Sequence, residues 1–375
     1  MKRIIVCVCT LMLLMLTTSH AQTHIEHPIL AMGASAPDFK LPGVDGKTYT
    51  LASFQQSPIL LLVFTCNHCP TAQAYEDRIK KLVTDYSSRG VAIVAIMPND
   101  PKAVQLSELG YTDMGDSFEE MKVRSKEKAF NFPYLYDGAT ESTARAYGPV
   151  ATPHVFIFDK DRKLRYQGRI DDVEKPTATP RNFDTRNALD ALLNNTAIAV
   201  PSTKTFGCSI KWAEKEDLEK KNKEAWAKEP VKLDVIDEGG MRDLIDNRSD
   251  KLRVINFWSL NNPASKTAFA NFVTANRMYR ARDFEWISVN TDGEKSKAAV
   301  LKFLQQQQAS ATNLIFGTGN LTELAGSFDP NWKGGLPYTL IVETGGKIVM
   351  AKQGTVDAFK LKKTIVENHM IGRYY

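Results

Sequence analysis

Two cysteines separated by two residues are the feature of this sequence most suited to chemistry. Cys66 and Cys69 enclose Asn67 and His68. This spacing brings two sulfurs within bonding distance, so the pair can alternate between a dithiol and a disulfide. The thiolate is the reactive form, and both a following helix N-terminus and a protonated His68 stabilise negative charge on the first sulfur. We therefore predict thiol–disulfide exchange, with a lowered pKa for Cys66 and not for Cys69.

The same pair has two alternative interpretations, a structural disulfide and half of a zinc site. Zinc would need two further ligands. The sequence holds five cysteines, of which Cys7 and Cys9 lie in the N-terminal segment considered next, so Cys208 is the only other thiol. We therefore expect neither a metal nor a cofactor. Cys208 itself is either a resolving or intermolecular thiol, or an inert buried one.

The first 21 residues have the pattern of a secretory signal peptide. A basic start at Met1-Lys2-Arg3 precedes an apolar stretch from Ile4 to Leu16, and small residues allow cleavage after Ala21. The apolar stretch is shorter than the ~20 residues that a membrane-spanning helix needs, although an uncleaved anchor is the alternative. We predict a periplasmic or secreted protein without stable membrane insertion once the signal is removed.

The composition is that of a folded protein with little excess charge. Apolar residues make up 43% of the chain, charged residues 24%, and the net charge is +5. This charge is too small for an electrostatic nucleic-acid footprint, so we expect no nucleic-acid partner. A length of 375 residues suggests two domains at about 150 residues each.

The residues around the cysteine pair alternate between predicted strands and helices, as in a mixed α/β sheet covered on both faces. The run Ile59–Thr65 is continuously apolar, which is typical of a strand buried on both sides, and a helix is predicted at Pro70–Tyr86 directly after Cys69. Further predicted strands cover residues 37–41, 48–51, 91–97, 134–136, 154–158 and 164–168, and further helices cover residues 116–130, 139–147 and 186–194.

A charged connection separates this region from a second one of the same kind. Residues 211–232 carry 13 charged side chains, and Glu-before-Lys pairs four residues apart favour a solvated helix. Strands are then predicted at residues 254–259, 284–290, 313–316, 338–343 and 347–353, and helices at residues 263–282, 294–307 and 356–368. A shift of 193 residues aligns Phe64 with Phe257 and Pro70 with Pro263, which indicates an internal duplication.

Further motifs accompany the cysteine pair in the first region. They are Gly33-Ala34-Ser35-Ala36-Pro37-Asp38-Phe39 with Asp45-Gly46-Lys47 and Leu51, then Cys66 to Pro70, Thr152-Pro153, and Leu164 to Gly168. In this order they resemble the N-terminal hairpin, the redox-active motif, the cis-proline loop and the final hairpin of the redoxin (AhpC/TSA-like) branch of the thioredoxin superfamily. The resemblance spans residues 33 to about 172 and implies a thioredoxin-like fold.

The resemblance also implies roles for individual residues. Cys66 would attack, Cys69 would resolve, and Pro153 would pack against the disulfide, while His68 adds a charge that tunes the pair. Protein thiols and disulfides are the implied substrates, and an upstream redox partner would reset the pair. His154, which follows the proline, is expected to form a wall of the pocket rather than a ligand.

Two alternative functions stay open at this point. The Pro-x3-Thr-x2-Cys pattern of peroxiredoxins is absent, because Ile59 and Val63 stand at those positions before Cys66. A thiol peroxidase with a peroxiredoxin-like antioxidant role is therefore one alternative. A copper-binding thioredoxin-fold metallochaperone is another, although those proteins have three residues between the cysteines. Leu60 replaces the buried Asp of many thioredoxins, which leaves the acceptor of the resolving thiol's proton open.

The second region resembles a thioredoxin fold without its redox chemistry. The gapless alignment places Ser259 and Asn262 at the cysteine positions, and an alignment shifted by three residues places Asn262 and Ser265 there. Gly335-Leu336-Pro337 is the candidate cis-proline loop. We expect this region to bind substrate or support the structure, and not to transfer electrons.

The predicted organisation follows from these observations. It consists of a signal peptide at 1–21, a redox-active redoxin domain at 33–173, an extension and charged helical linker at 174–228, and a redox-inactive thioredoxin-like domain at 229–375. His24 and His27 have metal-like spacing but are expected to lie in a solvated tail.

Overall fold

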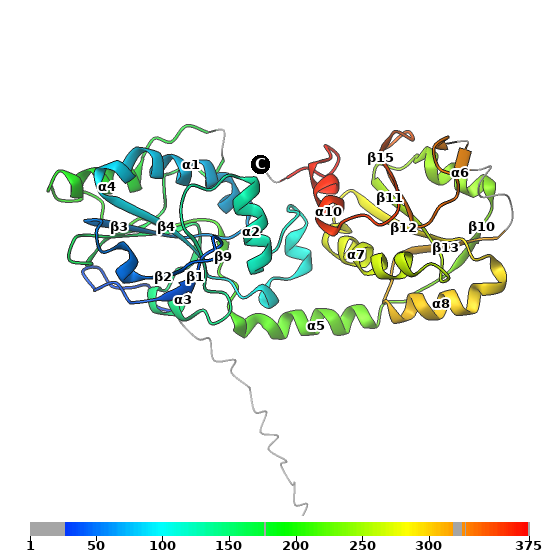
Figure 1. Cartoon of the computed structure of the whole chain (residues 1–375), viewed down its shortest axis with the longest axis horizontal. Coiled ribbons are helices and arrows are strands. Elements are labelled where there is room, and N and C mark those ends of the chain that lie inside the picture. Colours follow the sequence, from blue (N-terminus) through cyan, green and yellow to red (C-terminus); the bar gives the residue numbers. More distant parts are fainter. Residues whose placement is uncertain (1–26, 176–177, 318–324, 327, 374–375) are drawn as a thin grey trace, which may run out of the picture.

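Two large β-sheets, one in each half of the chain, organise the molecule (Figure 1). The computed structural model describes residues 27–175, 178–317, 325–326 and 328–373. The predicted signal peptide and His24 lie outside these residues. Among the described residues, no helix combines the length and the apolar character needed to cross a membrane.

The first sheet has the strand order β5-β4-β3-β7-β8. Its strands are β3 (Ile59–Phe64), β4 (Val91–Met97), β5 (Tyr134–Tyr136), β7 (His154–Phe158) and β8 (Leu164–Gly168). The strands β3, β4 and β5 run parallel to one another. Strand β7 pairs antiparallel with β3, and β8 pairs antiparallel with β7. All six residues of β3 are buried, because helices cover both faces of the sheet.

Helices on the two faces of this sheet form separate apolar clusters. On one face lie α1 (Pro70–Tyr86), α2 (Phe118–Glu127) and α4 (Asp184–Leu193), whose buried residues include Tyr75, Met121 and Leu189. On the other face lie α3 (Ser142–Tyr147) and the hairpin of β1 (Lys40–Pro42) and β2 (Thr48–Thr50). Short strands β6 (Ala151–Thr152) and β9 (Cys208–Ser209) pair with each other beside the sheet.

The second sheet has the strand order β10-β13-β12-β11-β14-β15. Its strands are β10 (Asp234–Ile236), β11 (Leu252–Trp258), β12 (Phe284–Asn290), β13 (Thr312–Phe316), β14 (Tyr338–Val342) and β15 (Ile348–Gln353). The strand β11 pairs parallel with β12 and antiparallel with β14, as β3 does with β4 and β7. The order β13-β12-β11-β14-β15 therefore repeats the order and directions of the first sheet.

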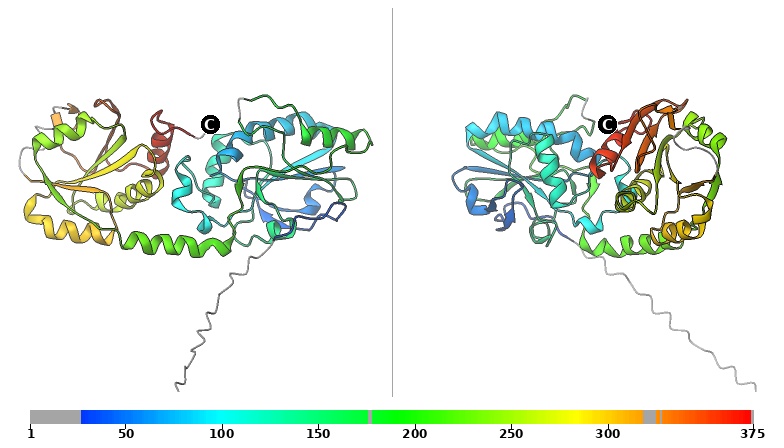
Figure 2. Two further views of the ribbon diagram at one scale, coloured as in Figure 1. Left: turned by 180° about the vertical axis from the view of Figure 1, so that it is seen from behind. Right: turned by 45° about the vertical axis from the view of Figure 1, so that its right-hand side comes forward.

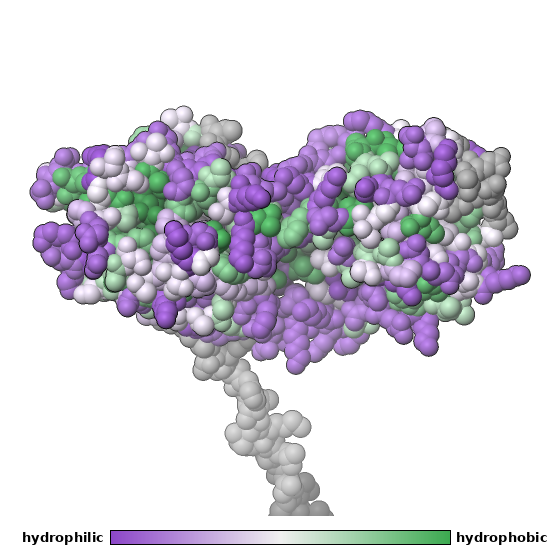
Figure 3. Space-filling view, in the orientation of Figure 1, coloured by the Kyte–Doolittle hydropathy of each residue, from purple (hydrophilic) through white to green (hydrophobic). Residues whose placement is uncertain are grey.

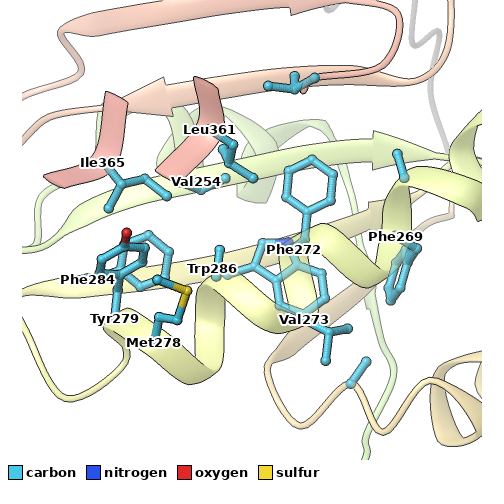
Figure 4. Packing of buried hydrophobic residues seen from close by; sticks show 14 of the residues in the cluster. Val254, Phe269, Phe272, Val273, Met278, Tyr279, Phe284, Trp286, Leu361 and Ile365 are labelled. Carbon is cyan, nitrogen blue, oxygen red and sulfur yellow. The ribbon is translucent and has the colours of Figure 1, made fainter. Parts of the chain in front are cut away.

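The core of the second half lies between its sheet and helices α7 and α10. Trp286 and Phe284 of β12 meet Phe272 and Tyr279 of α7 (Pro263–Tyr279), while Leu361 comes from α10 (Ala358–Glu367) (Figure 4). Helix α8 (Lys297–Gln306) adds to the same cluster, and α6 (Glu238–Asp246) covers the other face of the sheet. These apolar contacts are the main stabilising term of this half.

Helix α5 (Glu216–Ala227) connects the two halves and runs along one side of both (Figures 1 and 2). Hydrophilic side chains cover its outer surface (Figure 3), as expected from its sequence. Its Trp226 is nevertheless buried, with the Arg277 guanidinium 4.6 Å from its ring centroid. The predicted charged connecting helix is therefore present, but one side of it packs against the second half.

The two halves also touch through the loop at residues 104–117. Val104 and Leu109 pack in the same buried cluster as α7. The Tyr279 hydroxyl donates to the Thr112 carbonyl at 2.7 Å, and the Arg373 guanidinium donates to the Asp113 carboxylate at 2.9 Å. This loop is thus held on one side by the second half of the chain.

The mixed α/β architecture confirms the predicted fold class. The predicted domain boundaries stay a prediction. In the structure, α4 and β9 of the proposed extension at 174–228 pack against the first sheet region.

Candidate functional site

The two cysteines lie where β3 ends and α1 begins. Cys69 is the N-cap residue of α1, and Pro70 occupies the first helical position, where a missing N–H costs nothing. Both thiols are free. Cys66 is only 3% exposed and Cys69 is fully buried. The positive end of the helix dipole therefore lies at Cys69 rather than at Cys66.

The loop at Thr152-Pro153 faces both sulfurs. The Thr152–Pro153 peptide bond is cis, which confirms the predicted cis-proline loop. The Thr152 hydroxyl lies 3.1 Å from Cys66 Sγ, and the Thr152 carbonyl oxygen lies 3.5 Å from Cys69 Sγ. The structure thus brings the predicted residues Cys66, Cys69 and Pro153 to one place.

His68 forms a buried ion pair with Asp116. Its Nδ1 lies 2.6 Å from Asp116 Oδ2, and both side chains are buried. Burial opposes charge on the ring, but the Asp116 carboxylate raises the pKa of His68. Burial likewise opposes charge on the carboxylate, but His68 lowers the pKa of Asp116. Within the part of the chain that the structure describes, the buried Nε2 atom of His68 has no hydrogen-bond partner.

The Asp116 carboxylate also organises the loop between the cysteines. It accepts the backbone N–H groups of Asn67 at 2.9 Å and His68 at 3.1 Å, and the Asn99 amide at 2.6 Å. Four donors thus satisfy a buried negative charge, which offsets its desolvation. The Asn67 side chain in turn donates to the Gly115 carbonyl, so the cysteine loop is tied to the loop that carries Asp116.

The predicted order of the cysteine pKa values is wrong for this structure. Burial, a hydrogen bond with Cys69 and the negative charge of Asp116 raise the pKa of Cys66. Burial opposes ionisation of Cys69 too, but hydrogen bonds from the Cys208 and Cys66 thiols and the positive His68 lower its pKa. The directions of these pKa shifts favour a thiolate at Cys69, which caps the helix, over one at Cys66, which lies within 4.8 Å of Asp116.

Cys208 lies beside this pair. Its backbone N–H donates to Cys69 Sγ at 3.3 Å, and its side chain is half-buried. Hydrogen bonding to Cys69 and burial raise the pKa of Cys208. Sequence spacing gave no indication of this proximity, because 139 positions separate the two cysteines.

Asp116 is the residue that sequence reasoning missed. Residues 116–130 were predicted as a helix, but α2 begins at Phe118 with Ser117 as its N-cap, which accepts the Glu120 N–H. Asp116 is therefore outside the helix and free to reach His68. The Ser-x-x-Glu pattern of a capping box at Ser117 was the available signal. Leu60, which stands where many thioredoxins have an Asp, is a fully buried core residue.

The other two histidine candidates, His154 and His27, make packing or hydrogen-bond contacts within the fold. His154 is buried, its Nε2 lies 2.7 Å from Gln167 Oε1, and burial lowers its pKa to about 4. This agrees with a wall position rather than a charged ligand. His27 stacks on Trp212 with ring centroids 3.9 Å apart, so the prediction that it lies in a solvated tail is wrong.

Three side chains in the site are of the types that bind metal ions. Ligand atoms of Cys66, His68 and Asp116 lie within 4.8 Å of one another. Asp116 Oδ2 is already engaged by the His68 ring and the Asn99 amide, so hydrogen bonding accounts for the cluster as it stands.

In the second half, the structure agrees with the gapless alignment, which places Ser259 and Asn262 at the positions of Cys66 and Cys69. Helix α7 begins at Pro263 with Asn262 as its N-cap, as α1 begins at Pro70 after Cys69. The Asn262 amide donates to the carbonyl of Leu336, whose bond to Pro337 is cis. Ser259 donates a short hydrogen bond to Asp292. No thiol is present in this loop.

Comparison with known proteins agrees with the geometry of the first half. Residues 32–167 match the model of the AhpC/TSA family. The thiol-disulfide oxidoreductase ResA of Geobacillus thermodenitrificans is 25% identical over 150 residues, which cover 40% of this chain and 75% of that protein.

Two solved structures of uncharacterised proteins are also similar. A hypothetical protein from Sinorhizobium meliloti is 35% identical, with 50% of this chain and 97% of that chain covered and a TM-score of 0.44. A conserved protein from Geobacillus kaustophilus is 36% identical, with 49% and 93% covered and a TM-score of 0.43. Residues 32–167 are thus similar to the AhpC/TSA family, and this match together with the ResA relative supports a thiol–disulfide oxidoreductase activity.

Proposed function

We propose that Cys66 and Cys69 form the redox-active disulfide of an exported protein that exchanges it with protein thiols and disulfides. The observation that carries this proposal is the placement of two free thiols at the start of α1, both in contact with Thr152 beside Pro153. Export rests on the N-terminal sequence pattern. An upstream redox partner would reset the pair after each turnover.

The protonation of the pair supports a division of roles. In reduction of a partner disulfide, Cys66 gives up its proton and attacks one partner sulfur, and the other partner sulfur leaves as a thiolate that takes up a proton. The Cys69 thiolate then attacks Cys66, which breaks the mixed disulfide, forms the Cys66–Cys69 bond and releases the reduced partner. A thiolate suits this second step, because only the deprotonated sulfur is a nucleophile. His68 holds the negative charge on Cys69, and Asp116 fixes the ring of His68 in place. This pair takes the place of the buried Asp that Leu60 replaces.

The test measures reduction of insulin by dithiothreitol with the full chain after residue 21. Cys66→Ser and Cys69→Ser should each reduce the rate by at least about a hundredfold, since either change removes the disulfide. Ser259→Ala is the matched control, because Ser259 occupies the position of Cys66 in the second half. It should stay within about twofold of the unchanged protein. Full activity in Cys66→Ser would contradict the proposal.

A copper-binding role is retained as a second candidate, because Cys66, His68 and Asp116 offer three ligand atoms within 4.8 Å of one another. Titration of the reduced protein with Cu(I) separates the two functions. Tight binding that is lost in both Cys66→Ser and His68→Gln, combined with no insulin reduction, would favour copper. Hydrogen peroxide consumption in the same preparation tests the thiol peroxidase alternative.

A further inference from the structure

The segment at residues 205–209 lies across the loop that faces the reactive sulfurs. Strand β9 pairs antiparallel with β6, and Cys208 stands opposite Thr152. The Thr205 hydroxyl donates to the Pro153 carbonyl at 2.8 Å, and the Phe206 ring packs against Tyr75 of α1 with centroids 6.1 Å apart. Contacts on both sides therefore hold this segment, which we name the strap, over the thiols.

Gly207 makes this close approach possible. Its φ is +129°, a region that residues with a side chain rarely adopt. A Cβ atom at this position would lie 2.1 Å from the Thr152 carbonyl oxygen, which is backbone and cannot turn away. The contact between strap and loop thus depends on a residue without a side chain.

The strap places a third sulfur in the same enclosure as Cys66 and Cys69. The Cys208 N–H points at Cys69 Sγ from 3.3 Å, so the Cys208 backbone lies directly against the second cysteine of the pair. All three thiols are free, and Cys208 keeps part of its surface exposed while Cys66 and Cys69 are buried. The proximity of Cys69 also raises the pKa of the Cys208 thiol, which agrees with this arrangement.

We propose that Cys208 is the third redox-active cysteine of this site and exchanges with the disulfide at Cys69. This rests on the proposed function, because it begins from the Cys66–Cys69 disulfide. Cys208 loses its proton and attacks the sulfur of Cys69. The Cys66–Cys69 bond breaks, a Cys69–Cys208 bond forms, and Cys66 leaves as a thiolate that takes up a proton. No net oxidation occurs, and Cys66 becomes available for another exchange.

Tryptic mapping of the oxidised full chain tests this proposal. Cleavage after Lys47, Arg78, Lys204 and Lys211 places Cys66 and Cys69 together on residues 48–78 and Cys208 on residues 205–211. The protein is treated with one equivalent of diamide, quenched in acid, alkylated with iodoacetamide and digested. A fraction of peptide 205–211 should be linked to peptide 48–78 through Cys69, with Cys66 carrying the alkyl group.

Two matched variants fix which sulfur is the partner. In Cys66→Ser, diamide should close a Cys69–Cys208 disulfide within the monomer. In Cys69→Ser, which leaves Cys66 and Cys208, closure should be at least about tenfold slower. Circular dichroism checks that both variants are folded.

The failures of the two proposals differ in this experiment. If the unchanged chain forms only Cys66–Cys69 and Cys66→Ser keeps both remaining thiols free, Cys208 is an inert thiol and the present proposal is overturned. Equal closure rates in the two variants would also overturn it, because Cys69 would then not be the specific partner. If the unchanged chain forms no Cys66–Cys69 disulfide at all, the proposed function itself fails.

Discussion

The loops at residues 66–69 and 259–262 occupy the same place in two sheets of the same strand order. Each follows the central strand, each ends in the N-cap of a 17-residue helix that begins with proline, and each faces a cis-proline loop. The last residue contacts the carbonyl before that proline in both cases, through the sulfur of Cys69 or the amide of Asn262. The backbone arrangement is therefore independent of the redox chemistry.

The two loops differ in the charged groups that stabilise them. The first loop has a buried His68–Asp116 ion pair and thiols against the helix end. In the second loop, Asp292 accepts hydrogen bonds from neutral donors, among them Ser259 and the Leu260 N–H. Two loops of one shape can thus be either a reactive site or an ordinary helix start. The comparison indicates that the two thiols and the buried ion pair, rather than the fold, distinguish the proposed redox site from the second loop.

The largest expected effect comes from removing the charge of Asp116. Asp116→Asn breaks a buried ion pair and should lower the free energy of unfolding by about 3 kcal/mol. Asp292→Asn is the matched change in the second loop, and it should cost about 1.5 kcal/mol, since it weakens hydrogen bonds from neutral donors to a carboxylate and breaks no ion pair. Chemical denaturation monitored by fluorescence measures both. Equal losses would show that the ion pair does not set the two loops apart.

The residues that follow the two cis prolines, His154 and Tyr338, should differ in their dependence on pH. Burial lowers the pKa of His154 to about 4, below its unfolded value of roughly 6.5. Between these values the unfolded chain binds the extra proton, so stability is lost as pH falls from about 6.5 towards 4. From pH 7 to 4.5, His154 should cost about 2.5 kcal/mol of unfolding free energy.

His154→Gln should remove this part of the pH dependence. The measured quantity is the difference in unfolding free energy between the unchanged chain and the variant at pH 7 and at pH 4.5. Tyr338→Phe is the corresponding change in the second half. If the difference for His154→Gln is the same at both pH values, His154 does not titrate as the structure indicates.

A third expected effect concerns the strap, which covers the cis-proline loop of the first half. No strand or isolated bridge in the described residues pairs with Leu336 in this way. Gly207→Ala should destabilise the strap by about 1–3 kcal/mol, because a Cβ would collide with Thr152 and φ is positive. Alkylation of Cys66 and Cys69 by iodoacetamide should then accelerate about tenfold or more.

Gly33→Ala is the control for this substitution. Gly33 also has a positive φ, but a Cβ there meets nothing within 4 Å. It should leave the alkylation rates unchanged. If Gly207→Ala does so too, the strap does not control access to the thiols.

The smallest expected effect tests the inert loop. Asn262 caps α7 by accepting the Ser265 N–H at 2.9 Å. Asn262→Ala should therefore lower the unfolding free energy by about 1 kcal/mol. Insulin reduction should not change, because no thiol is involved. A large loss of activity would mean that the second loop takes part in the reaction.

Much of the fold could be predicted because strong local patterns specify it. The apolar run at Ile59 and the proline at position 70 define β3 and α1, and the predicted range of α1 agrees with the structure. Strand β10 and helix α6 were missed. The three-residue strand is too short to show alternation, and Gly239 and Gly240 argue against a helix by propensity.

The site was predictable only where its residues are close in sequence. Cys66, His68 and Cys69 lie within one loop, and Pro153 was found by resemblance. Asp116 and Cys208 reach the site through folding of distant segments, and local spacing carries no information on such contacts. The order of the cysteine pKa values was missed for the same reason, because it depends on burial and on the charge of Asp116.

The contact between the halves links the redox centre to the order in which the chain is made. The loop that carries Asp116 is held from outside by Tyr279, Arg282 and Arg373. During synthesis the first half emerges early and can fold before these residues exist. Cys66 and Cys69 are thus synthesised long before Arg373, the last residue that contacts the loop carrying Asp116. The loop that supports the proposed redox centre therefore gains its last contact only once residue 373 has joined the fold.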